Sequence, residues 1–484
     1  MSEPSHPYLS TRSIVLAAIA LVLLGAGLVT VLLWAYGSGT ESDKARLEAI
    51  KTAGTIVVGT GGAAALWLAA RRQQTAEFAV HQKKLDQAHQ DRVAAQTEHD
   101  ASERRVTDLY TKSVELLGSE NASVRLGGMY ALERLAQNVP DQRQTIVNVL
   151  CAYLRMPEKE SAEDRQVRLT AQRILASHLH PEGDTFWGGI DLDLTGAVLV
   201  DFDLTSCRVR TAAFDAAKFV GAAAFREVLF AGEATFEHAE FGAEASFTNA
   251  EFGGRAAFGD TEFADIAWFS RAVFRAVARF DNAVFGEDAW YSEAMFAGPV
   301  LFDDAEFGQR ALFTQARFGY HAGFRRSRFK QDAHFRQAIF ERGGNVSFEL
   351  AEFSRTAWFV DAEFGAAARF DETVFGELAH FGSARFNAAT LFTKARFDGE
   401  CNFKEAAFAE MASFYEAEFG SNVSFHDAEF RGDVGLVKVR ARIDVLPSSA
   451  RVWPDGVSEV DLVTDAEAAL KGREGRWGYL TVRA

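Results

Sequence analysis

Cysteine is nearly absent from this chain of 484 residues, which has only Cys151, Cys207 and Cys401. The three are odd in number, widely spaced and without a CxxC pair. The sequence therefore predicts a reducing compartment, with no disulfide framework and no zinc site. Proline is scarce as well, at 8 residues, whereas phenylalanine occurs 42 times. This bias toward one aromatic residue indicates a repeat that requires it at fixed positions.

Basic residues are too few to balance the acidic ones, with 51 Lys and Arg against 67 Asp and Glu and a formal net charge of −16. Binding to DNA phosphates relies on Lys and Arg replacing counterions, so this balance opposes it. The sequence predicts no direct contact with nucleic acid.

Motifs of enzyme active sites are missing too: we find no GxGxxG in a βα context, no GxxxxGK[ST], no GxSxG and no HExxH. His178 and His180 lie close together but have no further ligand cluster beside them. The acidic residues of the repeat region fall at solvent-facing positions, where two carboxylates become neighbours simply because coils stack. We expect no enzyme, no metal site and no cofactor.

Two uncharged stretches lie near the N-terminus, SIVLAAIALVLLGAGLVTVLLWAY at 13–36 and TAGTIVVGTGGAAALWLAA at 52–70. Their lengths predict two transmembrane helices, after a tail at 1–12 and joined by a loop at 37–51. A buried soluble helix is the alternative for these stretches. Positive residues are more numerous on the side shared by both termini than in the loop, which predicts a multi-pass protein of the cytoplasmic membrane with both termini in the cytoplasm.

The next two segments read as helical. Residues 71–117 contain no Gly and no Pro and predict a long helical stalk, either solvated or in a dimeric coiled coil. Residues 118–183 contain VRLGGMYALERLA and VRLTAQRILASHL, offset by a period in the HEAT and armadillo range. We expect a small HEAT-like subdomain that caps the C-terminal half of the chain; binding of a partner peptide is the alternative.

A repeat dominates residues 190–430. Apolar residues recur every five positions from Leu194 to Phe219, and then at alternating intervals of six and five in the pattern AxFxxAxFxxx up to Phe430. From Phe214 onward every central residue is Phe except Tyr291, and most have Ala two positions earlier. A large ring and a small methyl are thus both required, which predicts a solenoid with stacked rings inside and Ala in the corners. The predicted structural core includes Phe236, Phe241, Phe247, Phe252, Phe258, Phe313, Phe318, Phe364, Phe370, Phe414 and Phe419.

This pattern resembles the pentapeptide-repeat family, within which a Phe-rich variety with eleven-residue units occurs. The HEAT-like segment before it is similar to what accompanies membrane-bound bacterial members of the family. The resemblance implies a mainly β fold, a right-handed quadrilateral β-helix with about 22 residues per coil and about ten coils. The chain departs from the family pattern in carrying Phe instead of Leu and in adding one residue to every second unit. The segment ERGGNVS before Phe348 interrupts the register and predicts a bulge or loop. Residues 431–484 lose the Phe register and predict a C-terminal cap with a short helix at DAEAALKGR.

For function, we expect a membrane-anchored, non-catalytic scaffold that binds an unidentified protein at the cytoplasmic face. The bilayer would be its other partner, and homo-oligomerisation is left open. The acidic repeats also allow a DNA mimic acting on an enzyme such as gyrase, as the resemblance implies, and an envelope structural element is a third hypothesis. The predicted interaction patch, for which a solvated basic face is the alternative, is Arg317, Arg325, Arg326, Arg328 and Lys330.

Overall fold

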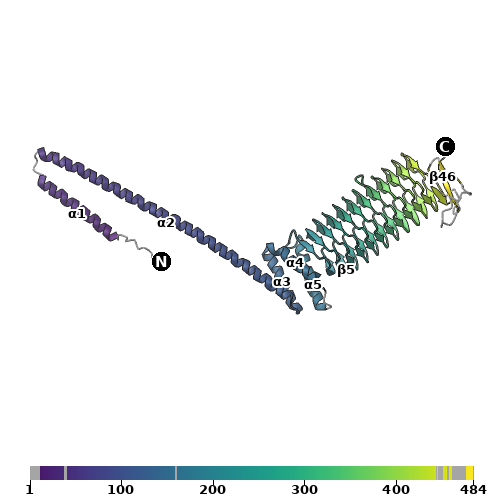
Figure 1. Ribbon diagram of the computed structural model, residues 1–484, viewed down its shortest axis with the longest axis horizontal. Helices are drawn as coiled ribbons and strands as arrows, with labels where there is room; N and C mark the ends of the chain where they lie inside the picture. Colours follow the sequence, from purple (N-terminus) through teal and green to yellow (C-terminus); the bar gives the residue numbers. More distant parts are fainter. Residues whose placement is uncertain are drawn as a thin grey trace. The chain divides into compact units, whose positions relative to one another are not determined.

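The computed structural model describes residues 11–36, 41–157, 161–442, 444, 451–454, 457–460 and 476–482. The chain divides into two compact units, Met1–Arg104 and Arg105–Ala484. The first unit contains helix α1 (Thr11–Tyr36) and most of helix α2 (Glu41–Leu117) (Figure 1). The second predicted span and the predicted stalk are therefore parts of one helix, which begins inside the predicted loop at Glu41.

The prediction of two transmembrane helices is not supported by this structure. Among the residues described, no helix has both the length and the apolar character needed to cross a bilayer. Residues 52–70 are rich in Gly and Ala, whose small side chains contribute little apolar surface, and they continue directly into the charged remainder of α2. The predicted multi-pass location in the membrane is wrong on this finding.

The second unit begins with a helical subdomain of α3 (Ala122–Asn138), α4 (Arg143–Arg155) and α5 (Ala162–Leu179), with a 3₁₀ turn (Pro140–Gln142) between the first two. Asn121 caps α3 by accepting a hydrogen bond from the Ser123 amide, and Ser161 caps α5 in the same way through the Asp164 amide. These helices lie where the HEAT-like pair was predicted.

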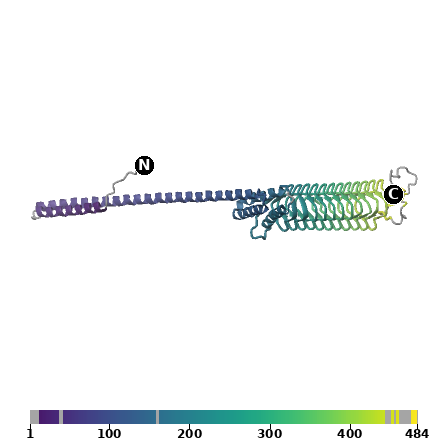
Figure 2. The same ribbon diagram turned by 90° about the horizontal axis from the view of Figure 1, so that it is seen from below.

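The repeat region forms a four-sided β-solenoid, whose stacked coils are seen from the side in Figure 2. Its first coil contains β1 (Asp191–Asp193) on face 1, the two halves of β2 (Val198–Asp203) on faces 2 and 3, and β3 (Arg208–Val209) on face 4. The chain then returns to face 1 with β4 (Thr211–Ala213), and β5 (Lys218–Ala224) again covers faces 2 and 3. Every pairing between coils is parallel, and most later strands are two residues long, from β6 (Leu229–Phe230) to β43 (Val434–Gly435).

Coil length follows the sequence period. Asp191 pairs with Thr211 in the first coil, where the period is five, whereas Ala212 pairs with Ala234 once the eleven-residue unit begins. Two extra residues enter at the exposed turn 341–345, so that Ala322 pairs with Val346. The sheet on face 1 has 12 strands and the sheet on face 4 has 11, about one coil more than the ten expected.

From Phe214 onward the interior consists of four columns of rings, one from each face of a coil, whereas the first coil has Leu194, Leu199, Leu204 and Val209 at these positions. Phe236 stacks on Phe258 of the next coil with centroids 4.6 Å apart and planes within 3°. Between columns the rings meet edge to face, as Phe236 does with Phe247 at 5.5 Å and 89°. All eleven phenylalanines predicted for the core are no more than 1% exposed.

At one corner of each eleven-residue unit, one residue has a left-handed backbone conformation with positive φ. Almost all of these residues carry a side chain and are not glycine. In the first of the regular units the residue is Ala216, with φ 53°, and the corner is closed by a hydrogen bond from the Ala217 amide to the Phe214 carbonyl at 3.0 Å. The left-handed region crowds a Cβ against the backbone, which costs about 1 kcal/mol relative to glycine.

We therefore expect Ala216→Gly to raise the free energy of unfolding by about 1 kcal/mol. Ala216 is exposed and its methyl contributes almost no packing, so relief of this strain should dominate. Urea denaturation followed by circular dichroism measures the change. Ala213→Gly, in strand β4, is the matched control and should be destabilising. A loss of stability in Ala216→Gly equal to that of the control would contradict the prediction.

The helical subdomain caps the N-terminal edge of the solenoid through side-chain amides. The Gln144 side chain donates to the Asp191 carbonyl at 2.9 Å and accepts from the Asp191 amide at 2.9 Å, as a neighbouring strand would. Gln172 does the same with Val200, at 2.8 and 3.2 Å. Backbone groups that would otherwise be orphaned at this edge are thereby satisfied, so the subdomain has the capping role favoured from the sequence.

At the opposite end, β44 (Arg440–Arg442) pairs antiparallel with β46 (Trp477–Val482), which also pairs with β45 (Val457–Val460). Trp453 packs on the last rings, with its centroid 5.4 Å from that of Phe419. These described strands lie within the segment predicted as a C-terminal cap. The short helix predicted at DAEAALKGR lies outside the described residues.

Candidate interaction site

The five residues predicted as a basic interaction patch are not brought together on one face. Arg317 lies on β22 (Arg317–Phe318) of face 4, and Arg328 lies on β24 (Arg328–Phe329) of the opposite face 2. Arg325 and Arg326 occupy the turn before β24, and Lys330 follows it.

Each of these cations is paired with a carboxylate of an adjacent coil. Arg317 contacts Glu341 at 3.0 Å, and Arg325 contacts Glu349 at 3.3 Å. Arg326 contacts Asp304 at 2.5 Å, and both Arg328 and Lys330 contact Glu306. These exposed pairs align the charges of successive coils and contribute little stability individually.

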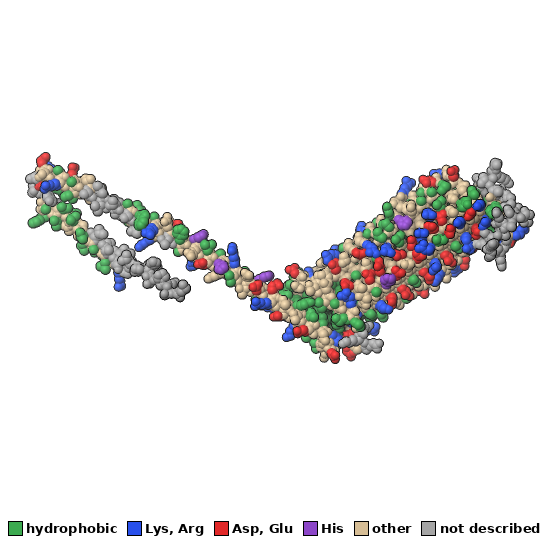
Figure 3. Space-filling model, in the orientation of Figure 1, with side chains coloured by type: hydrophobic (Ala, Val, Ile, Leu, Met, Phe, Trp, Pro, Cys, Tyr) green, Lys and Arg blue, Asp and Glu red, His purple; other side chains and the backbone are tan. Residues whose placement is uncertain are grey.

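The same pairing extends along the solenoid, where Figure 3 shows acidic and basic side chains intermixed on the visible face. Arg255 contacts Glu233 at 3.1 Å, Arg355 contacts Glu377 at 3.2 Å, and Lys438 contacts Glu416 at 3.3 Å. Because cations of one coil neutralise carboxylates of the next, the negative charge is interrupted at many points along the rod.

His178 and the three cysteines are buried in the protein interior. His178 is buried, stacks on Trp187 with centroids 4.0 Å apart, and its Nε2 lies 2.8 Å from Glu133 Oε1. Burial raises the pKa of Cys151 and of Cys207 to about 12 and that of Cys401 well above its usual value, which disfavours reactive thiolates. Within the described residues there is no group of three His, Cys, Asp or Glu arranged to hold a metal ion.

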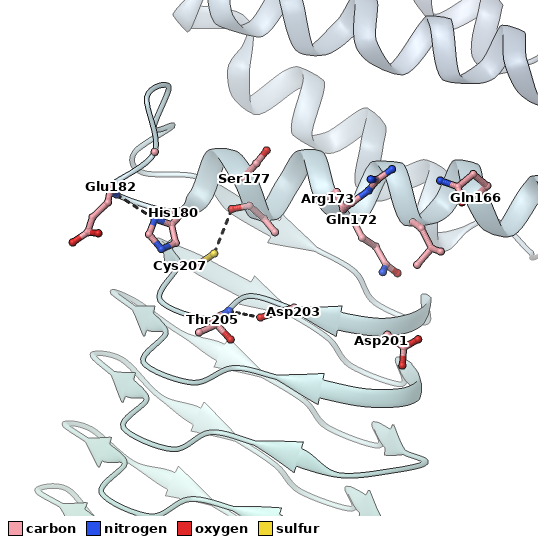
Figure 4. Close-up of a pocket in the computed structure, with 13 residues that line it drawn as sticks. Gln166, Gln172, Arg173, Ser177, His180, Glu182, Asp201, Asp203, Thr205 and Cys207 are labelled. Carbon is pink, nitrogen blue, oxygen red and sulfur yellow. Dashed lines mark hydrogen bonds between the residues drawn. The ribbon is translucent and has the colours of Figure 1, made fainter.

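A groove of about 1000 Å³ is lined by α5 on one side and by the first coil on the other. Figure 4 shows Arg173 and Ser177 on the helix side and Asp203 and Thr205 on the coil side, with His180 and Glu182 at one end. Asp203 Oδ1 accepts a hydrogen bond from the Thr205 amide at 2.8 Å. At the floor, the Cys207 thiol donates to the Ala176 carbonyl at 3.5 Å.

A column of side chains, aromatic except for one leucine, runs along the outside of face 3. It is formed by the outward residues of six successive strands: β13 (Ala267–Trp268), β17 (Ala289–Trp290), β21 (Ala311–Leu312), β25 (Ala333–His334), β29 (Thr356–Trp358) and β33 (Leu378–His380). We call this set, Trp268, Trp290, Leu312, His334, Trp358 and His380, the outer column. All six side chains are half-buried.

Neighbouring rings of the outer column stack on one another, and arginines lie over two of them. Trp268 and Trp290 have centroids 4.8 Å apart, and Trp358 lies 5.3 Å from His380. The Arg336 guanidinium lies 4.1 Å from the Trp358 ring centroid, a cation–π distance. Burial and the charge of Arg336 lower the pKa of both His334 and His380, which favours the neutral form of these imidazoles.

The outer column is absent from the sequence-based prediction, although the sequence contains a signal for it. Trp268, Trp290 and Trp358 each follow a buried Ala and precede a central aromatic residue, in AWF, AWY and AWF. Trp268 pairs with Trp290 one coil later. A search for any residue type that recurs at one position of every second unit would have found the column.

Comparison with known proteins agrees with this geometry. A family model described as pentapeptide repeats (9 copies) matches residues 258–306, 291–339 and 392–440, all within the solenoid. No curated protein and no solved structure matches the chain. The matched repeats and the four-sided coil, with parallel ladders on every face, show that this chain belongs to the pentapeptide-repeat family.

Proposed function

We propose that this chain is a non-catalytic interaction scaffold that binds a protein partner through the outer column on face 3 of its solenoid. The stacked aromatic stripe is the observation that carries the proposal. A column of half-exposed Trp and His side chains is unusual on a surface that is rich in Glu, Asp, Arg and Lys.

The filled interior of the solenoid favours binding at its outer surface. Its rings fill the solenoid, with each central Phe between Phe214 and Phe419 no more than 2% exposed, which leaves no space for a ligand inside the coils. Binding must therefore use the outer faces or the ends.

The chemistry of the outer column is that of a protein interface. Tryptophan and arginine are the residues most enriched among those that dominate binding energy, and here Arg310 and Arg336 lie beside Trp290 and Trp358. The indole Nε1–H groups of Trp268 and Trp290 are buried and have no acceptor among the described residues.

Charge distribution favours this proposal over DNA mimicry. A mimic needs an uninterrupted run of negative charge, whereas ion pairs such as Arg255–Glu233 and Arg355–Glu377 interrupt it. A protein partner that covers an aromatic stripe with charged margins does not have this requirement.

Site-specific photocrosslinking tests the proposal. The photoreactive residue p-benzoylphenylalanine would replace Leu312 in the outer column, or Leu301 of β19 (Val300–Leu301) on the opposite face 1 as the matched control. We expect one discrete adduct in cells from position 312 and none from position 301. Equal adducts from the two positions, or none from 312, would contradict the proposal.

Once the partner is known, its affinity provides a quantitative test. Trp290→Ala and Trp358→Ala should each weaken binding by about 2 kcal/mol, about thirtyfold in Kd, because each removes a large ring from the interface. Titration calorimetry measures this loss, and circular dichroism confirms that each variant is folded. Leu301→Ala on face 1 is the control and should bind as the unmodified chain does.

A further inference from the structure

The N-terminal edge of the solenoid is capped on three faces and open on the fourth. On face 1, Gln144 pairs with both backbone groups of Asp191, and on face 2, Gln172 pairs with those of Val200. On face 4, the Arg210 amide donates to the Ile190 carbonyl at 2.8 Å. Only the second half of β2, on face 3, has no such cap among the described residues.

Two carbonyl groups at this open edge are in position to accept hydrogen bonds. One coil further on, the equivalent carbonyls of Ala224 and Arg226 accept from the amides of Leu204 and Ser206, at 2.8 and 2.7 Å. In the first coil these positions belong to Asp203 and Thr205, and the described part of the chain supplies neither with a donor. Backbone acceptors of this kind are a template for an added strand.

The groove beside α5 provides the space for such a strand. It runs along the open edge between the exposed side chains of α5 and the coil residues from Asp201 to Cys207. A second hollow of about 450 Å³ shares His180 and Glu182 with it and continues toward face 4 past Glu227 and Glu251. Carboxylates outnumber cations along this path, with Asp201, Asp203, Glu182, Glu227 and Glu251 against Arg173 and Arg208.

From these observations we infer that the groove binds an extended, basic peptide segment of a partner protein as an additional parallel strand on face 3. The peptide takes the place of the missing preceding coil. Alternate amides of its backbone donate to the carbonyls of Asp203 and Thr205, and its Lys or Arg side chains contact the acidic rim. This site is separate from the outer column and does not depend on it.

The probe for a direct test is a fluorescent octapeptide of alternating Lys and Val, acetylated and amidated at its ends, added to the full-length chain. Fluorescence anisotropy should show saturable binding. Two further peptides are N-methylated on all Lys amides or on all Val amides. An extended strand directs alternate amides to opposite sides, so we expect one methylated peptide to lose binding by about tenfold or more and the other to retain it.

Variants of the groove provide the second part of the test. Ser177→Trp places a large ring in the groove from an exposed position of α5, and Arg165→Trp makes the same change at an exposed position outside it. We expect the first to weaken binding by about tenfold and the second to leave it unchanged. Glu182→Gln with Asp201→Asn should weaken binding severalfold at low salt.

Each of the following results would overturn the inference: no binding of the Lys–Val peptide, equal binding by the Ser177→Trp and Arg165→Trp variants, or equal loss of binding on both patterns of methylation. A Glu–Val peptide that binds more tightly than the Lys–Val peptide would also overturn it. The Trp290→Ala and Trp358→Ala variants should bind the peptide normally, so failure of this site and failure of the outer column are distinguishable.

Discussion

Phe313→Ala should lower the free energy of unfolding by about 3–5 kcal/mol, because it removes a fully buried ring and leaves a cavity that the rigid coils cannot close. Phe313 stacks between Tyr291 and Phe335, with centroids 4.9 and 4.8 Å away. It also meets Phe302 edge to face at 5.4 Å. All of these contacts are lost together.

The damage should be local, because each coil of a solenoid contacts only its neighbours. Amide hydrogen exchange measured by mass spectrometry should show faster exchange in the coils around residues 291–335. The coils near Phe236 and Phe414 should keep their protection. Leu312→Ala is the control, since its half-buried side chain points outward from the adjacent position, and it should cost about 1 kcal/mol or less. Uniform loss of protection over all coils would show that the solenoid unfolds as one unit and would refute the local picture.

Tyr291→Phe should raise the free energy of unfolding by about 1–3 kcal/mol. Tyr291 is the one tyrosine in the four ring columns, and its hydroxyl is buried with no hydrogen-bond partner among the described residues. Phenylalanine keeps the stacking on Phe269 and Phe313, at 4.9 Å on both sides, and removes only the unsatisfied hydroxyl. Chemical denaturation measures the gain.

The exposed Tyr320 provides the control, because Tyr320→Phe should change stability by less than about 0.5 kcal/mol. Burial also raises the pKa of Tyr291 well above its usual value of 10.0, so the folded chain keeps the proton where the unfolded chain releases it. The resulting stability is present below pH 10 and declines as the pH rises above that value. Tyr291→Phe should remove this part of the alkaline loss, and an unchanged pH dependence would count against the burial of the hydroxyl.

The solenoid could be predicted from the amino-acid sequence alone. Its Phe spacing sets the number of residues per coil, since each ring must lie above the ring one coil before, and the change from five to eleven residues appears as a longer coil. The Ala two positions earlier is buried for the same reason, because the corner has no space for a larger side chain. The sequence period predicts the coil length and the buried Phe and Ala positions because equivalent residues of successive coils contact one another.

The spatial arrangement of side chains that are not part of the repeating Phe and Ala pattern could not be predicted in this way. The run of basic residues from Arg317 to Lys330 is adjacent in sequence but distributed around the coil, because a four-sided solenoid turns a corner about every five residues. The two transmembrane helices were predicted from the lengths of two uncharged stretches, and this prediction was wrong. The structure places residues 52–70 inside one long helix with a charged remainder, and no described helix is both long and apolar enough to cross a bilayer.

Which surfaces can bind a partner depends on how the coils and helices pack in three dimensions. The outer column exists because parallel stacking places Trp268, Trp290 and Trp358 in line on face 3, far apart as they are in the sequence. The caps formed by Gln144 of α4 and Gln172 of α5, and the uncapped carbonyls of Asp203 and Thr205, depend on where these two helices lie against the first coil. A repeat specifies contacts between equivalent residues, whereas the ends and the outer faces depend on contacts between residues that no period relates.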